Sequence, residues 1–103
     1  MSKRLAYLEK ATAAGATDPF VWYGLAQEYR TLGRDDDSLA TFTKLREASP
    51  DYVAMYLMCG QLLEKMGRIA DARDWLGAGI AAARAKRDSH ALGELEAALS
   101  ALD

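Results

Sequence analysis

Residues 19–52, PFVWYGLAQEYRTLGRDDDSLATFTKLREASPDY, decide how this chain folds. The stretch is 34 residues long, and residues 53–86 repeat its chemical pattern at the same spacing. The aromatic residue Trp22, for example, recurs as Tyr56, and a glycine–arginine pair stands near the middle of both copies. Self-similarity at a fixed period of this length is the sequence signature of a repeat protein. The chain is therefore predicted to contain two copies of one structural unit.

Each copy has the pattern of two helices joined by a tight turn. Apolar residues recur at three- and four-residue spacing on both sides of Gly33 and of Gly67, which predicts amphipathic helices. Glycine supplies the backbone freedom that such a turn requires. Asp18 can cap the first helix, and Pro19 fits its first position. Val, Ile and Thr are sparse, which argues against a sheet.

The first copy also resembles the tetratricopeptide repeat (TPR), residue by residue. Eight residues match that family's aromatic, leucine, small, aromatic, glycine, small, aromatic and proline positions: Trp22, Leu25, Ala26, Tyr29, Gly33, Ser38, Phe42 and Pro50. The resemblance covers most of the chain, which is identified as a small, bacterial-type protein with two repeats. It implies an all-α, TPR-like fold: a right-handed α-α superhelix of antiparallel helix hairpins, with five to six helices.

Two shorter segments flank the complete repeats. Residues 4–14 have apolar side chains at helical spacing, which predicts a helix. A step of 34 residues back from Phe42 reaches Leu8, so this helix is predicted to be the second helix of a partial repeat. Beyond the second copy, Arg84 stands where the first copy has Pro50, so the fourth helix is predicted to be longer.

The last segment fits a period of 36 residues better than one of 34. At 36 residues its leucines align with the apolar stripe of the third helix: Tyr56 with Leu92, Cys59 with Leu95, Leu63 with Leu99, and Met66 with Leu102. This segment is therefore predicted to be a capping helix. The predicted organisation is a single TPR-like domain, residues 1–103, made of a partial repeat helix (4–14), repeat 1 (19–52), repeat 2 (53–86) and a capping helix (89–102).

The apolar stripes predict which side chains form the core. Trp22 and Tyr56 should be largely buried, and Leu32 should continue the buried stripe that contains Trp22. Six further core residues are predicted: Leu25, Tyr29, Phe42, Leu63, Leu76 and Leu95.

Composition and charge exclude several classes of function. The net charge is −2 and the pI about 5.4, so the electrostatic attraction expected of a nucleic-acid-binding protein is missing. No stretch approaches the ~18 apolar residues of a membrane span. Glu9 and Lys10 end the first apolar run too early for a signal peptide, and a single cysteine fits a reducing compartment. The prediction is a cytoplasmic protein that binds neither nucleic acid nor membrane.

Residues that usually carry catalysis are scarce. His90 is the one histidine, and the one cysteine, Cys59, lies on an apolar stripe, which favours a core role over that of a nucleophile. Asp35, Asp36 and Asp37 lack the alternating spacing of a calcium loop and suit the start of a helix, where acids are stabilising. The sequence has neither a zinc-ligand cluster nor a phosphate-binding glycine loop. We predict no enzyme activity, cofactor or metal site.

The resemblance also implies that partners bind along a concave face lined by the first helix of each repeat. The predicted partner-binding residues are those of these helices that the core stripes do not use: Phe20, Tyr23, Gln27, Arg30, Leu57, Met58, Gln61, Glu64 and His90. Chaperone-binding members of the family hold a terminal carboxylate there with Lys, Asn and Arg, and this chain lacks that set. Its aromatic, Met and Leu side chains better suit an apolar side chain or a helix. The alternative is that Phe20, Tyr23 and Leu57 pack against neighbouring helices.

The predicted function is a non-catalytic protein–protein interaction module that binds a peptide segment or a partner protein on this face. A second copy of the chain is an alternative partner, which would make the protein a homodimer or a self-associating structural module. A small helical enzyme or a small-molecule binder is the other alternative, and the scarcity of His and Cys argues against it.

Overall fold

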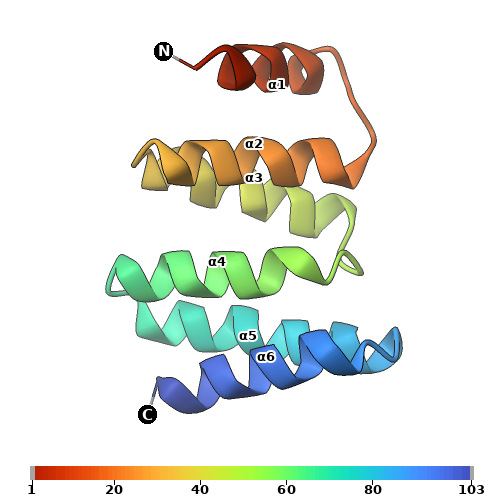
Figure 1. Ribbon diagram of the computed structural model, residues 1–103, viewed down its shortest axis with the longest axis vertical. Coiled ribbons are helices and arrows are strands. Elements are labelled where there is room, and N and C mark those ends of the chain that lie inside the picture. Colours follow the sequence, from red (N-terminus) through yellow and green to blue (C-terminus); the bar gives the residue numbers. More distant parts are fainter. Residues whose placement is uncertain (1, 103) are drawn as a thin grey trace. The chain divides into compact units, whose positions relative to one another are not determined.

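The computed structural model describes residues 2–102, which form six α-helices and no strand (Figure 1). In chain order the helices are α1 Lys3–Ala13, α2 Pro19–Thr31, α3 Asp35–Ala48, α4 Ala54–Lys65, α5 Ile69–Ala85 and α6 Ser89–Ala101. The prediction of an all-α, TPR-like fold with five to six helices is confirmed.

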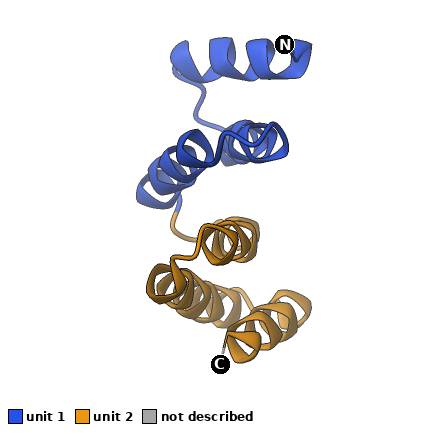
Figure 2. Ribbon diagram, turned by 90° about the vertical axis from the view of Figure 1, so that its left-hand side faces the viewer, with its two compact units in different colours: residues 1–49 blue, residues 50–103 orange. Residues whose placement is uncertain are grey.

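The chain divides into two compact units, which Figure 2 shows in different colours. Unit 1, residues 1–49, contains α1, α2 and α3; α2 and α3 form an antiparallel hairpin, and α1 packs on α2. Unit 2, residues 50–103, contains the hairpin of α4 and α5, with α6 packed against both of its helices.

Three turns within the units are built alike. Gly33 and Gly67 end α2 and α4 with φ of 76° and 77°, in the left-handed region that favours glycine. In each turn the arginine that follows donates its amide to the carbonyl five residues earlier, at 2.9 Å. The turn between α5 and α6 has the same bond, from Asp88 to Ala83, but Arg87 takes the left-handed position with φ of 56°. A non-glycine residue there costs about 1–2 kcal/mol, and the sequence pattern did not predict this third turn.

The helices begin with the caps that the sequence suggested. The Asp18 carboxylate accepts the amide of Phe20 at 2.9 Å, and Pro19 follows at the first helical position. The three acids Asp35, Asp36 and Asp37 occupy the first turn of α3, where they complement the partial positive charge of the helix N-terminus. Residues 2–102 contain no group of three or more side chains suited to hold a metal ion.

The core of unit 1 forms where α2 meets each of its neighbours. Leu5 and Leu8 of α1 pack with Leu25 of α2 in one buried cluster. On the side of α2 that faces α3, Phe42 is fully buried. Burial of each such side chain contributes about 1.5–3 kcal/mol relative to exposure. The hairpin thus supplies most of this unit's core, and α1 covers one side of α2.

The core of unit 2 depends on close helix approach. An added Cβ on Gly60 of α4 would lie 2.6 Å from a terminal carbon of Leu76 on α5. An added Cβ on Gly79 of α5 would clash with Tyr56 and lie 2.9 Å from Leu95 of α6. Both glycines therefore let a neighbouring side chain fill the space that their own would occupy.

Most predicted core residues are buried, and three are not. Tyr56 is buried at 3 % exposure, and five others are confirmed as core: Leu25, Phe42, Leu63, Leu76 and Leu95. Trp22 and Tyr29 are only half-buried, because the indole N–H reaches the Ala16 carbonyl at 2.7 Å and the tyrosine hydroxyl reaches a carboxylate of α1. Leu32 is 45 % exposed, so its assignment to the buried stripe was wrong; as the C-cap residue of α2 it lies where the helical stripe ends.

Candidate partner-binding surfaces

The nine predicted partner-binding residues are divided between the units, and each set is described within its own unit. Four of them lie on α2 of unit 1: Phe20, Tyr23, Gln27 and Arg30. Helical spacing places them away from Leu25, which packs on α1.

An ordered pair of aromatic side chains occupies the first half of α2. Phe20 is 64 % exposed, and its ring stacks on Tyr23 with centroids 6.5 Å apart and planes at 24°. The Tyr23 ring in turn meets the buried Phe42 ring edge-on at 6.4 Å. Burial raises the pKa of the Tyr23 hydroxyl, which Arg30 and a hydrogen bond from Gln27 partly oppose. The exposed ring of Phe20 is thus supported by a chain of rings that reaches the core.

Gln27 has an unmet hydrogen bond beside these rings. Its Nε2 donates to the Tyr23 hydroxyl over a long 3.4 Å. Its Oε1 is buried and accepts no hydrogen bond from residues 2–102. A buried acceptor without a donor costs about 1–3 kcal/mol. A partner that offers an N–H to this amide would recover part of that cost.

The remaining five candidates lie in unit 2 and differ in exposure. Leu57 and Met58 of α4 are half-buried, whereas Gln61 and Glu64 further along α4 are exposed. His90, on α6, is exposed, and its Nε2 lies 3.3 Å from Oε1 of Glu94. The apolar members of this set thus retain some accessible surface at the start of α4.

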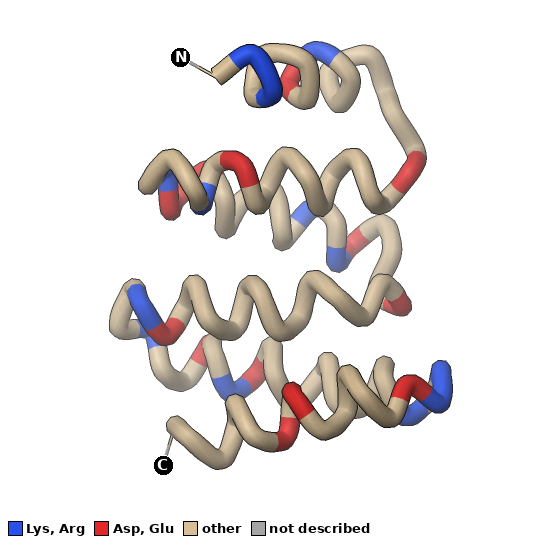
Figure 3. Tube along the Cα trace, viewed as in Figure 1, with Lys and Arg blue, Asp and Glu red and all other residues tan. Residues whose placement is uncertain are grey.

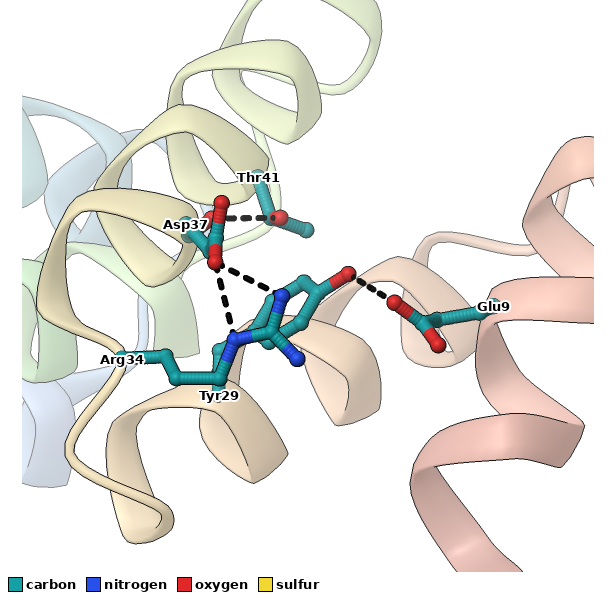
Figure 4. Close-up of polar contacts among 5 residues, drawn as sticks. All are labelled: Glu9, Tyr29, Arg34, Asp37 and Thr41. Atoms are coloured by element: carbon teal, nitrogen blue, oxygen red, sulfur yellow. Dashed lines mark hydrogen bonds and ion pairs between the residues drawn. The ribbon is translucent and has the colours of Figure 1, made fainter. Parts of the chain in front are cut away.

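A polar cluster in unit 1 was not predicted from the sequence (Figure 4). The Tyr29 hydroxyl donates to Glu9 Oε2 at 2.6 Å and so connects α2 to α1. The Arg34 guanidinium lies 4.6 Å from the centroid of the Tyr29 ring and forms an ion pair of 2.8 Å with Asp37. The hydrogen bond to Glu9, followed by burial, raises the pKa of Tyr29 to about 12.

Sequence patterns pointed to neither partner in this contact. Tyr29 matched an aromatic core position, and Glu9 served only to interrupt an apolar run. One signal was available: Glu9 follows Leu8, so helical geometry places it beside the buried stripe of α1. A carboxylate on that border can reach a hydroxyl of the helix that the stripe covers.

Next to this cluster lies a groove of about 440 Å³ among α1, α2 and α3. Trp22, Leu25 and Tyr29 of α2 line it, together with residues of α1 and α3 that include Glu9 and Lys44. None of the nine predicted partner-binding residues lines this groove.

The residues considered for catalysis do not form a reactive arrangement in unit 2. Cys59 is fully buried at 0 % exposure, whereas the His90 side chain is 89 % exposed and lies beside Glu94. A nucleophilic thiolate requires partial exposure and a nearby base, and a fully buried Cys59 fits a packing role. No helix within residues 2–102 has the length and apolar character required to span a membrane.

Comparison with known proteins gives results at the level of structure. No protein-family model matches the chain, and no curated protein matches it. The crystal structure of a tetratricopeptide repeat domain protein from Salinibacter ruber is similar, with 39% sequence identity and a TM-score of 0.79. The match covers 82% of this chain and 96% of that one.

Two solution structures give a consistent picture. A tetratricopeptide repeat domain protein from Salinibacter ruber, solved by NMR, is 38% identical with a TM-score of 0.80, over 84% of this chain and 87% of that one. A protein from Bordetella parapertussis is 25% identical with a TM-score of 0.83, over 99% of this chain and 89% of that one. With identity above one third over most of both chains, and with the repeat positions already described, this chain belongs to the tetratricopeptide repeat family.

Proposed function

We propose that this chain is a non-catalytic interaction module that binds a peptide segment or a partner protein on the first helices of its repeats, α2 and α4, with His90 of α6 at the margin. TPR-domain neighbours support a helical repeat module of the kind generally used for protein interaction. The observation that carries the proposal is the exposed ring of Phe20, stacked on Tyr23.

Phe20 and Tyr23 have the properties of an interaction anchor. Aromatic residues are enriched in protein interfaces, where they bury a large area at low cost in side-chain entropy. Because the Tyr23 ring is already held against Phe42, it loses little freedom when a partner binds. Such a pre-ordered pair suits an apolar side chain of the partner.

Gln27 adds direction to this apolar contact. Rotation of its side chain would bring the unsatisfied Oε1 to a partner N–H, while Nε2 could donate to a partner carbonyl. An amide placed four residues after Tyr23 lies one helical turn further along the same side of α2. Gln27 would therefore fix a backbone group of the partner next to the aromatic pair.

In unit 2, Leu57 and Met58 supply further apolar surface, with Gln61 and Glu64 beyond them on α4. Methionine adapts its shape to varied partners, which suits a surface that captures side chains. We also propose that residues 1–103 act together as one TPR-like domain, with repeats at 19–52 and 53–86.

The proposal is tested by capture of partners from an extract of the native cells, followed by mass spectrometry. The double variant Phe20→Ala, Tyr23→Ala should keep the helical signal in circular dichroism and lose the proteins that the unchanged chain captures. Leu32→Ala is the matched control, since it removes an exposed apolar side chain at the far end of α2 and should leave capture unchanged.

Two results would contradict the proposal. If the folded double variant captures the same proteins in the same amounts, the aromatic pair does not carry binding. If a small molecule binds the chain, and Trp22→Phe in the groove weakens that binding while Phe20→Ala does not, the small-molecule alternative is favoured.

A further inference from the structure

Within each complete repeat, a small residue of the first helix faces a small residue of the second. In unit 1 these residues are Ala26 and Ser38, both at 0 % exposure, and the Ser38 hydroxyl donates to the Ala26 carbonyl at 2.7 Å. The equivalent residues of unit 2 are Gly60 and Ala72, which are also buried. Small size at these positions lets the two helices of a hairpin approach closely.

The two end helices replace these small residues with charges of opposite sign. Helix α1 aligns with the second helices of the repeats, and a step of 34 residues back from Ser38 reaches Arg4. Helix α6 aligns with the first helices, and a step of 36 residues on from Gly60 reaches Glu96. The end helices thus carry an arginine and a glutamate at two positions that face each other in a complete hairpin.

We propose that α6 of one copy and α1 of a second copy associate as the two helices of a composite repeat, in which Arg4 pairs with Glu96. The proposal goes beyond the function given above, because it uses α1 and α6 instead of the aromatic surface of α2. Its partner is a second copy of this chain.

Both charges are accessible for such a pair. Arg4 is exposed, forms no ion pair with any residue between 2 and 102, and has a guanidinium nitrogen 3.5 Å from the Cβ position of Gly24. Glu96 is exposed and lies 3.7 Å from Arg84, a long ion pair that solvent screens. Each side chain therefore gains a closer partner in the composite repeat at little cost.

Apolar side chains of the two helices match as well. In unit 2, Trp75 of α5 and Tyr56 of α4 pack with ring centroids 5.9 Å apart. The same alignments place Tyr7 of α1 at the position of Trp75, and Leu92 of α6 at the position of Tyr56. Tyr7 is 71 % exposed and Leu92 is only half-buried, so the composite repeat would cover apolar surface on both helices.

The overall charges of the two helices are complementary (Figure 3). Helix α1, KRLAYLEKATA, has three basic residues and one acid. Helix α6, SHALGELEAALSA, has two acids and no lysine or arginine. Attraction between exposed charges is modest and screened by salt, so the association should be weak and strongest at low ionic strength.

This contact joins different surfaces of the two copies. Each chain that donates its α6 still has a free α1, and such head-to-tail contacts continue to further copies instead of stopping at two. The average mass in solution should therefore rise steadily with concentration.

Sedimentation velocity of the full chain, from micromolar to millimolar concentration at low salt, tests the proposal. Arg4→Glu or Glu96→Arg alone places like charges together and should weaken association at least about tenfold. The double variant Arg4→Glu, Glu96→Arg restores opposite charges and should recover association. A mixture of the two single variants should also associate, because each supplies the charge that the other lacks.

Lys44→Glu and Glu47→Arg on α3 are the matched controls, with the same changes of charge on another helix. They should associate as the unchanged chain does, and circular dichroism should show that all variants are folded. The proposal is overturned if the unchanged chain stays monomeric over the whole range, if the controls weaken association as much as the single variants do, or if neither the double variant nor the mixture recovers it.

Discussion

Tyr29 acts in unit 1 through its hydroxyl as well as through its ring. The ring packs against the cluster of Leu5, Leu8 and Leu25, while the hydroxyl donates to Glu9. Because α1 packs on α2 alone within its unit, this bond is one of few polar contacts that hold α1 in place. The neutral form of the tyrosine makes the bond, so its contribution depends on pH.

We expect this dependence to appear in alkaline solution. The pKa of Tyr29 is raised from 10.0 to about 12 in the folded chain, so its bond contributes fully below pH 10 and is lost as the pH rises through 12. The free energy of unfolding of the unchanged chain, minus that of Tyr29→Phe, should therefore fall between these pH values. Urea unfolding at several pH values measures this difference.

Tyr7→Phe, on the exposed side of α1, is the control for the general effects of alkali. A difference between the unchanged chain and Tyr29→Phe that stays constant from pH 9 to 12 would show that the hydroxyl bond is not formed in solution.

Phe42 is the residue on which unit 1 depends most. Its side chain is the largest that is fully buried, and it supports the Tyr23 ring. Phe42→Ala should lower the free energy of unfolding by about 3–5 kcal/mol, the range for truncation of a buried aromatic residue. Leu32→Ala should change it by no more than about 0.5 kcal/mol, because that side chain is exposed. Urea unfolding that shows equal losses for the two variants would contradict this assignment.

At the scale of helices, the glycines have unlike roles that the sequence does not distinguish. Gly60 lies on α4 against Leu76, whereas Gly77 lies on α5 with no atom of another element within 4 Å of its Cβ position. Both are inside helices, where glycine costs about 0.5–1 kcal/mol relative to alanine. Packing alone should decide how each tolerates a methyl group.

Two alanine variants test this difference. Gly60→Ala should destabilise the chain by about 1–3 kcal/mol, because the added methyl group overpacks a close helix contact. Gly77→Ala should stabilise it by about 0.5–1 kcal/mol, since the methyl group meets open space. Thermal unfolding of the two variants is the measurement, and an equal shift of the melting temperature in both would mean that α4 and α5 do not approach as described.

At the scale of the whole molecule, each unit contains its own tryptophan. Trp22 is in unit 1 and Trp75 in unit 2, so Trp75→Phe leaves a reporter for the first unit and Trp22→Phe one for the second. If residues 1–103 form one domain, as the repeat pattern predicts, the two reporters should give the same unfolding midpoint, since stacked repeats stabilise their neighbours.

The fluorescence of each single-tryptophan variant, followed through a urea titration, measures this midpoint. Circular dichroism of the same variants corrects for any stability that the substitution itself removes. Two midpoints that stay apart after this correction would show that the units unfold independently, against the prediction of a single domain.

The sequence by itself determined the helices, their order and the residues at their turns. These features depend on local properties: the spacing of apolar residues along a helix, the left-handed freedom of Gly33 and Gly67, and the cap formed by Asp18 and Pro19. The 34-residue period also predicted the family and most buried positions, such as Phe42, because each position recurs in the same surroundings in both copies.

The tertiary structure alone decided what lies on the borders of the helix faces. Met55 and Leu62 are fully buried although no stripe predicted them, while Trp22 remains half-buried. The contact of Glu9 with Tyr29 likewise depends on which side of α1 meets α2. The reason is physical: helical spacing fixes the direction of a side chain from its own axis, whereas its burial and partners depend on where neighbouring helices lie around that axis.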